Sequence, residues 1–249
     1  MREAWRRKKR RKKRITYTLV FICLIGIIYS TYSIITWKIN IDKNSKIKET
    51  LDDMVKIDKG NYKINFEKLK KKNPDTVAYL EIKNTNIEYI IVKGENNKYY
   101  LDHSFDKEYN IAGWPFADYH NKLDETDRNI IIYGHNMQDG SMLETLKDTL
   151  TKKWYENEEN HKILFITEQD KYYYQVFSTY TIIPESYYLT TSFDTDKEYL
   201  EFLKEIKSRS VHNYNVDLSE DDKILTLSTC TLDGKKRIVL HAKLINNNQ

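Results

Sequence analysis

The sequence predicts a mainly β domain that follows one membrane-spanning helix. Apolar runs of strand length, several of them alternating with polar residues, recur through the second part of the chain. The 20 tyrosines, against only 7 glycines and 3 prolines, favour ordered strands over disorder. Nearer the N-terminus, Ile15 to Trp37 contains no charged residue. The domain expected once the whole N-terminal region is set aside has about 190 residues, enough for one well-buried core.

Residues 1–14 and 15–37 together have the pattern of a membrane anchor. Ten basic residues lie between Arg2 and Arg14, and a helix over 15–37 would rise about 34 Å. The positive-inside rule places residues 1–14 in the cytoplasm and the folded domain outside the cell. No small-x-small cleavage site is evident, so we expect a single-pass anchor that is retained; a cleaved leader is the alternative.

The overall charge of +4 comes from that basic segment. Without it, 31 Lys and Arg stand against 36 Asp and Glu, so the rest of the chain is slightly acidic. No basic groove with interleaved aromatic residues is evident, and we therefore expect no nucleic-acid partner.

Two helices are expected ahead of the strands. Residues 38–60 form a polar, lysine-rich linker with one apolar stripe, which predicts an amphipathic helix. The positions in that stripe are Ile47, Leu51, Met54 and Val55. A second helix fits Phe66 to Lys72, before Asn73-Pro74. The folded domain is expected to span residues 61–249.

The strands follow in order. Residues 77–82 and 87–92 are expected to form a hairpin, and so are 162–167 and 171–183. The run 129–133 predicts a buried strand. The last two strands are expected at 224–229 and 237–244.

Two capping-box signals predict further helices. Ser141 and Glu144 begin a predicted helix that continues to Leu150. Thr195 and Glu198 begin another within 192–210, ahead of the last two strands. Its apolar stripe consists of Tyr199, Phe202, Leu203 and Ile206.

Three residues at strand ends suggest nucleophilic chemistry. Cys230 ends one strand, His135 follows another, and Arg237 opens the last. A thiol becomes a nucleophile at neutral pH when a base or cation is close, and an arginine can hold a developing oxyanion. Cys23 lies in the membrane segment, so a disulfide with Cys230 is not expected. The alternative for Cys230 is a small buried apolar residue.

Three motifs carry a family resemblance. They are Thr-Leu-Ser-Thr-Cys at 226–230, Tyr-Gly-His-Asn-Met-Gln-Asp-Gly-Ser-Met at 133–142, and Asn-Pro-Asp-Thr-Val-Ala-Tyr-Leu at 73–80. The sequence resembles the sortases, Gram-positive cysteine transpeptidases, and class B in particular, over roughly residues 58–244.

The resemblance implies a closed eight-stranded β-barrel with N-terminal helices and a helix inserted before the cysteine strand. It implies that the Cys230 thiolate attacks the threonine carbonyl of a C-terminal sorting signal and forms a thioester. His135 would transfer protons and Arg237 would bind the oxyanion. The spacing from cysteine to arginine varies in the family, and Lys235 and Lys236 adjoin Arg237, so its assignment rests on the strand alternation that it opens.

Three more residues are candidates for substrate binding. Ser228 and Thr229 precede the cysteine, although strand geometry alone would also explain them. Asp118 ends a Gly-x-x-Phe-x-Asp segment like one in class B sortases, and a structural turn is the alternative.

The resemblance also implies partners. They are surface proteins with an Asn/Ser-Pro-x-Thr-type signal, and an amine of a peptidoglycan cross-bridge or its lipid-linked precursor. The membrane is contacted through residues 15–37. No metal cluster, phosphate loop or dinucleotide fingerprint appears, so no cofactor is expected. A hydrolytic cysteine peptidase and a non-catalytic membrane-anchored barrel remain as alternatives.

Overall fold

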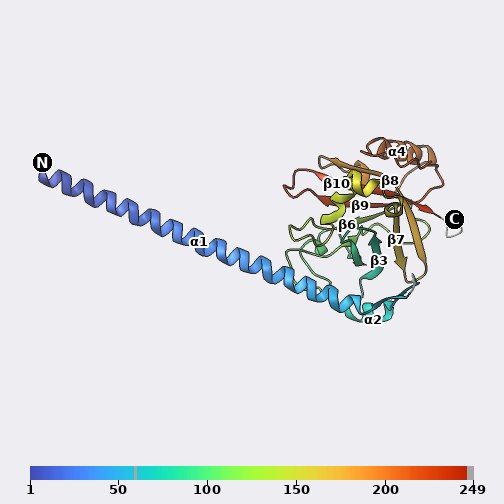
Figure 1. Ribbon diagram of the computed structural model, residues 1–249, viewed down its shortest axis with the longest axis horizontal. Coiled ribbons are helices and arrows are strands. Elements are labelled where there is room, and N and C mark those ends of the chain that lie inside the picture. Colours follow the sequence, from blue (N-terminus) through green and yellow to red (C-terminus); the bar gives the residue numbers. More distant parts are fainter. Residues whose placement is uncertain (59–60, 246–249) are drawn as a thin grey trace. The chain divides into compact units, whose positions relative to one another are not determined.

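The computed structural model describes residues 1–58 and 61–245 of the chain (Figure 1). Contacts divide it into two units, residues 1–43 and residues 44–249. The first unit is the greater part of helix α1 (Arg2–Asp52), which is long and apolar enough to cross a membrane. The last part of α1, from Asn44, belongs to the second unit, where Asn44 and Leu51 are buried.

The segment after α1 differs from the prediction. Helix α1 ends at Asp52, and a hairpin of β1 (Val55–Asp58) and β2 (Asn61–Ile64) follows where the helix was expected to continue. The hairpin gains cross-strand backbone hydrogen bonds that a longer helix would not make, so tertiary pairing overrides a helical spacing. Residues 59–60 of the predicted linker lie outside the described residues. Helix α2 (Phe66–Lys72) is confirmed.

Eight strands close into a barrel, which confirms the fold expected from the resemblance. The order around it is β10-β8-β7-β3-β4-β5-β6-β9. The strands are β3 (Thr76–Ile82), β4 (Glu88–Val92), β5 (Phe116–Ala117), β6 (Asn129–Tyr133), β7 (Lys162–Thr167), β8 (Lys171–Ile182), β9 (Ile224–Cys230) and β10 (Arg237–Ile245). Both predicted hairpins, β3–β4 and β7–β8, are antiparallel pairs. Strand β6 pairs with β9 in parallel.

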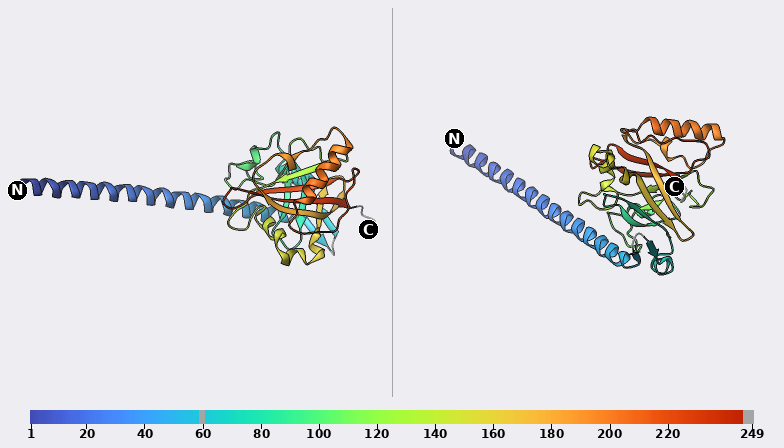
Figure 2. Two further views of the ribbon diagram at one scale, coloured as in Figure 1. Left: turned by 90° about the horizontal axis from the view of Figure 1, so that it is seen from above. Right: turned by 45° about the vertical axis from the view of Figure 1, so that its right-hand side comes forward.

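Strands β9 and β10 are buried on both faces. Leu225, Leu227 and Leu240 lie on one face, because side chains two residues apart share a face. The other face is covered by α4 (Asp196–Ser208) and the segments beside it, orange in Figure 2. Phe202 and Leu203 of α4 belong to the same buried cluster as residues of β8, β9 and β10. The inserted helix is therefore present, with Thr195 as its N-cap as predicted.

The segment after His135 is a correction to the predicted capping-box helix. A 3-10 helix, η2 (Glu144–Leu150), forms instead, without a side-chain cap. Ser141 Oγ donates to Asp139 rather than to a helix, and Met142 has a left-handed φ of 59°. The remaining short elements are η1 (Tyr99–Leu101), α3 (Lys152–Tyr155), η3 (Glu158–His161) and η4 (Tyr187–Leu189).

Candidate active site

The barrel brings the predicted cysteine, histidine and arginine to one end of three adjacent strands. Tyr133, the last residue of β6, is level with Ser228 on β9, so His135 follows two residues after the end of β6, at the end where β9 continues to Cys230. Arg237 on β10 lies directly opposite Cys230. In-register neighbours share a face of a sheet, so the side chains of Cys230 and Arg237 emerge on the same face.

Two hydrogen bonds tie the histidine loop to the cysteine strand. Asn136 Nδ2 donates to the Cys230 carbonyl at 2.7 Å, and Thr229 Oγ1 donates to the Gly134 carbonyl at 2.8 Å. Gly134 has no room for a side chain, because a Cβ there would lie 2.7 Å from Leu143 Cγ. The loop therefore leaves β6 in close contact with the end of β9.

The His135 ring has a main-chain partner that fixes its orientation. Its Nε2 lies 2.7 Å from the carbonyl oxygen of Leu101, in η1. A carbonyl oxygen only accepts, so Nε2 carries the hydrogen in this contact. In the neutral ring, Nδ1 is then the nitrogen that can accept a proton. Sequence reasoning found no such partner, because a main-chain carbonyl 34 residues away leaves no signal in residue type.

Arg237 is half-buried beside the cysteine and pairs with no acid among the described residues. Its Nη1 donates to the carbonyls of Lys236 at 3.3 Å and Gly234 at 3.5 Å. These contacts are long, which leaves the guanidinium able to turn toward a ligand oxygen.

Tyr188 of η4 is a neighbour of the site that sequence reasoning missed. The pKa of the Tyr188 hydroxyl is raised, chiefly by burial and to a smaller degree by Cys230. The hydrogen bond to Ser228 and the charge of Arg237 act in the opposite direction. The Tyr188 hydroxyl lies 3.0 Å from Ser228 Oγ. It therefore stands over the face of the sheet that carries Ser228, Cys230 and Arg237. The tyrosine sits in the long β8–β9 connection without a motif around it, so no pattern indicated it.

The three predicted substrate-binding residues differ in placement. Ser228 shares the face of Cys230, whereas Thr229 points to the opposite face and is 2% exposed. Asp118 is 3% exposed and lies beside β6. Its carboxylate accepts from the Tyr133 hydroxyl at 2.8 Å and from Asn97 Nδ2 at 2.7 Å. It also contacts the main-chain nitrogen and Nδ1 of His120, at 2.9 and 2.8 Å.

A buried polar chain lies on the same face, deeper along β9 and β10. His241 is fully buried, with Nδ1 2.8 Å from Thr226 Oγ1 and Nε2 2.9 Å from the Tyr180 hydroxyl. Thr226 donates its own hydrogen to Asn129 Oδ1 at 2.6 Å. His241 Nδ1 must then be the donor to Thr226, and Nε2 accepts from Tyr180. Burial, with a smaller effect of Arg209, lowers the pKa of His241 to about 3.

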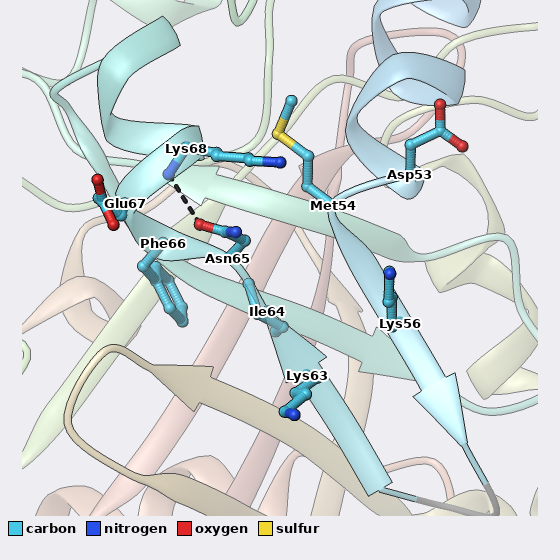
Figure 3. A pocket seen from close by; sticks show the side chains of 9 residues that line it. All are labelled: Asp53, Met54, Lys56, Lys63, Ile64, Asn65, Phe66, Glu67 and Lys68. Carbon is cyan, nitrogen blue, oxygen red and sulfur yellow. Dashed lines mark hydrogen bonds between the residues drawn. The ribbon is translucent and has the colours of Figure 1, made fainter.

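A cleft of about 490 Å³ lies elsewhere, between the end of α1, the β1–β2 hairpin and the start of α2 (Figure 3). Lys56, Lys63 and Lys68 are among its lining residues, and Asn65 caps α2 beside them. None of the predicted site residues lines it. The candidate chemistry is therefore at the end of β6, β9 and β10, and not in this cleft.

Comparison with known proteins identifies the family. The sortase domain model matches residues 80–245. The chain belongs to the sortase family. Sortase B of Staphylococcus aureus is 34% identical over 245 residues, which are 95% of this chain and 98% of that protein. This sortase is accordingly of class B, as the motifs indicated.

Solved structures agree with this assignment. The Bacillus anthracis sortase B in complex with AAEK1 has a TM-score of 0.74 and 31% identity, covering 84% of this chain and 99% of that one. A Staphylococcus aureus sortase B–substrate complex has a TM-score of 0.69 and 36% identity, covering 74% and 85%. The sortase B relatives and the barrel together support a transpeptidase of the cell envelope.

Proposed function

We propose that this sortase is a membrane-anchored cysteine transpeptidase whose reacting groups are Cys230, His135 and Arg237. The observation that carries the proposal is their placement: Arg237 is directly opposite Cys230, and two hydrogen bonds tie the loop of His135 to the end of the cysteine strand. These groups suit acyl transfer, which needs a thiol as nucleophile, an imidazole to transfer protons and a guanidinium to hold the oxyanion.

In the first half-reaction, the Cys230 thiolate attacks the carbonyl carbon of a threonine in the substrate. The carbonyl π electrons move to oxygen, and Arg237 binds the resulting oxyanion. His135, protonated on both ring nitrogens, gives the Nδ1 proton to the leaving amine while Nε2 stays bonded to Leu101. The peptide C–N bond breaks, and a thioester remains on Cys230.

In the second half-reaction, an amine attacks the thioester carbonyl. His135 Nδ1 takes the proton from that amine, and Arg237 again holds the oxyanion. Collapse of the tetrahedral intermediate expels Cys230 as a thiolate and leaves a new amide bond. The site returns to its starting protonation, so no co-reactant beyond the amine is needed.

The substrate is a surface protein with a C-terminal Asn/Ser-Pro-x-Thr-type signal, and the acceptor is an amine of a peptidoglycan cross-bridge or its lipid-linked precursor. The related Staphylococcus aureus sortase B has been solved as a substrate complex, which supports a peptide-binding role for the same barrel. Ser228, beside Tyr188, is the better placed of the two predicted strand residues to touch the signal. We assign Thr229 and Asp118 supporting roles: Thr229 donates to the Gly134 carbonyl, and Asp118 accepts from the Tyr133 hydroxyl.

The membrane anchor is residues 15–37 of α1, with residues 1–14 in the cytoplasm. Residues 44–249 then stand outside the cell, where envelope substrates are found. This topology follows from the basic segment and the uncharged stretch in the sequence.

The test uses the full chain in detergent micelles and fluorogenic Asn/Ser-Pro-x-Thr peptides, with and without an added amine. Cys230→Ala and His135→Ala are expected to abolish cleavage, and Arg237→Ala to lower kcat/KM by about 10²–10³-fold. Arg237→Lys restores little, because lysine lacks the planar fork of donors. Lys235→Ala, a neighbouring exposed cation, is the matched control and keeps full activity.

Amide product that forms only with added amine supports transpeptidation. Cleavage that yields acid alone, whatever the amine, points to a hydrolytic peptidase. Cleavage that survives Cys230→Ala contradicts the proposed mechanism, and no cleavage by the parent chain favours a binding role.

A further inference from the structure

We propose that Asn44, near the end of α1, is a positioning residue for His135 and acts through Gly113 and the Leu101 carbonyl. The inference rests on the proposed catalytic role of His135. All four residues belong to the second unit of the chain. The link would join the helix that leaves the anchor to the proton-transfer group of the barrel.

Asn44 is held by both ends of its amide. It is 4% exposed, its Nδ2 donates to the Gly113 carbonyl at 3.0 Å, and its Oδ1 accepts from Asn110 Nδ2 at 3.0 Å. Asparagine is a poor helix former, and a buried amide that loses a hydrogen-bond partner is destabilising. A residue of this kind inside α1 therefore serves the 110–113 loop more than the helix.

The 110–113 loop in turn supports η1. Asn110 N donates to the Asp102 carbonyl at 2.9 Å, and the residue after Gly113, Trp114, donates its N–H to the Tyr100 carbonyl at 3.0 Å. These two bonds flank Leu101. The loop and η1 therefore move as one piece of backbone.

Gly113 is packed against the carbonyl that orients the histidine. Its φ is +58°, and a Cβ there would lie 2.4 Å from the Tyr100 oxygen and 2.7 Å from the Leu101 oxygen. The Leu101 oxygen is the atom that accepts from His135 Nε2 at 2.7 Å. Any shift of Gly113 toward η1 therefore displaces the acceptor of the catalytic hydrogen bond.

The consequence is specific. If Asn44 is replaced by alanine, its bonds to the Gly113 carbonyl and to Asn110 Nδ2 are lost and the loop relaxes. The Leu101 carbonyl then no longer holds Nε2–H in one place. His135 then samples orientations in which Nδ1 is misaligned for proton transfer. A misplacement of about 1 Å can cost on the order of 10²-fold in rate. No residue assigned to substrate binding is changed, so kcat should fall while KM is kept.

The experiment compares Asn44→Ala with Ser45→Ala in the full chain. Ser45 is the next residue of the same helix and is exposed, so its replacement controls for changes in α1 itself. Two readouts are used: kcat and KM for peptide cleavage, and the pH profile of Cys230 alkylation by iodoacetamide. The expected result for Asn44→Ala is a kcat lower by at least tenfold, a KM within twofold, and a shifted alkylation profile. Ser45→Ala matches the parent in both.

A second pair of variants asks whether the effect passes through the histidine. In a His135→Ala background, Asn44→Ala is expected to leave the alkylation profile unchanged. An equal effect of Asn44→Ala with and without His135 would overturn the inference, and so would a lower thermal midpoint with unchanged kcat and unchanged profile. If Asn44→Ala does not fold, Asn44→Ser, which keeps one hydroxyl for the buried loop, is measured in the same way.

The alkylation arm needs no peptide. If the parent chain cleaves no sorting peptide, yet Asn44→Ala shifts the alkylation profile only when His135 is present, the proposed function fails and the positioning link stands. If the parent cleaves and Asn44→Ala behaves like the parent, the link fails and the function stands.

Discussion

Acidification is expected to destabilise the barrel through His241. His241 is on β10, next to the cysteine strand, and its imidazole is fully buried between Thr226 and Tyr180. Its two hydrogen bonds fix it as a neutral ring. Thr226 has already given its hydrogen to Asn129, so a second proton on the ring would disrupt the bond from Tyr180. The pKa of His241 in the fold is lowered to about 3 by burial.

The sign follows from proton binding. An unfolded chain takes up a proton at this histidine near pH 6.5, whereas the fold resists it down to about pH 3. Between these values the unfolded state binds more protons, so the free energy of unfolding falls as the pH falls. One extra proton on the unfolded chain is worth about 1.4 kcal/mol per pH unit, so the loss between about pH 7 and pH 4.5 is roughly 2–3 kcal/mol.

The assay is urea unfolding of the full chain, followed by tryptophan fluorescence at about pH 7 and pH 4.5. The partner variant is His241→Gln, which keeps a polar amide in the site but cannot titrate. The parent is expected to lose roughly 2–3 kcal/mol more than the variant over this interval. The pKa of His161 is also lowered by burial. This histidine and the carboxylates titrate in both proteins, so their contributions cancel in the difference.

The absolute stability of His241→Gln at pH 7 does not enter the test, because only the change with pH is compared. Equal losses in the two proteins would refute the reasoning, since they would mean that His241 is protonated in the fold at acid pH without cost.

Three further variants test the architecture of the site. Gly134→Ala is expected to lower the free energy of unfolding by about 1–3 kcal/mol and to remove most of the activity, because the added Cβ clashes with Leu143. An unchanged thermal midpoint would mean that the Leu143 side chain moves aside without cost. Asp118→Asn is expected to lose about 1–3 kcal/mol in urea unfolding, since an amide cannot accept all four hydrogen bonds; unchanged stability with a raised KM would instead favour substrate contact. Asn136→Ala is expected to reduce kcat by about tenfold at constant KM, because the bond to the Cys230 carbonyl is lost; an unchanged kcat would contradict a role in alignment.

Local patterns predicted most of the strands and two of the helices. Apolar runs and alternation placed seven strands close to their observed bounds, and Asn73-Pro74 marked the end of α2. These strands are β3, β4, β6, β7, β8, β9 and β10. These features depend on neighbouring residues, which a sequence displays directly. The closed barrel was expected only from the resemblance, because strand order and the parallel β6–β9 pairing depend on residues far apart.

The misses have the same origin. The apolar pattern predicted that the amphipathic helix continues past Asp52, but the backbone there pairs as the strands β1 and β2 instead. Ser141 and Glu144 have the spacing of a capping box, yet the left-handed Met142 and its bond to the Tyr89 hydroxyl turn the chain into a 3-10 helix. The orienting carbonyl of Leu101 is invisible for a further reason, since every residue has a carbonyl.

The parallel pairing of β6 with β9 has a consequence for the order of folding. Thr229 and Gly134, which join the two strand ends, are 95 positions apart in the chain. Contacts this distant close large loops, and they form late and slowly compared with hairpins. Until they form, the thiol of Cys230 lacks the loop of His135 beside it, whereas the local antiparallel pairing of β9 with β10 already places Arg237 opposite it. The proposed site is therefore completed only when the barrel closes, after the strands that carry Cys230 and Arg237 have paired.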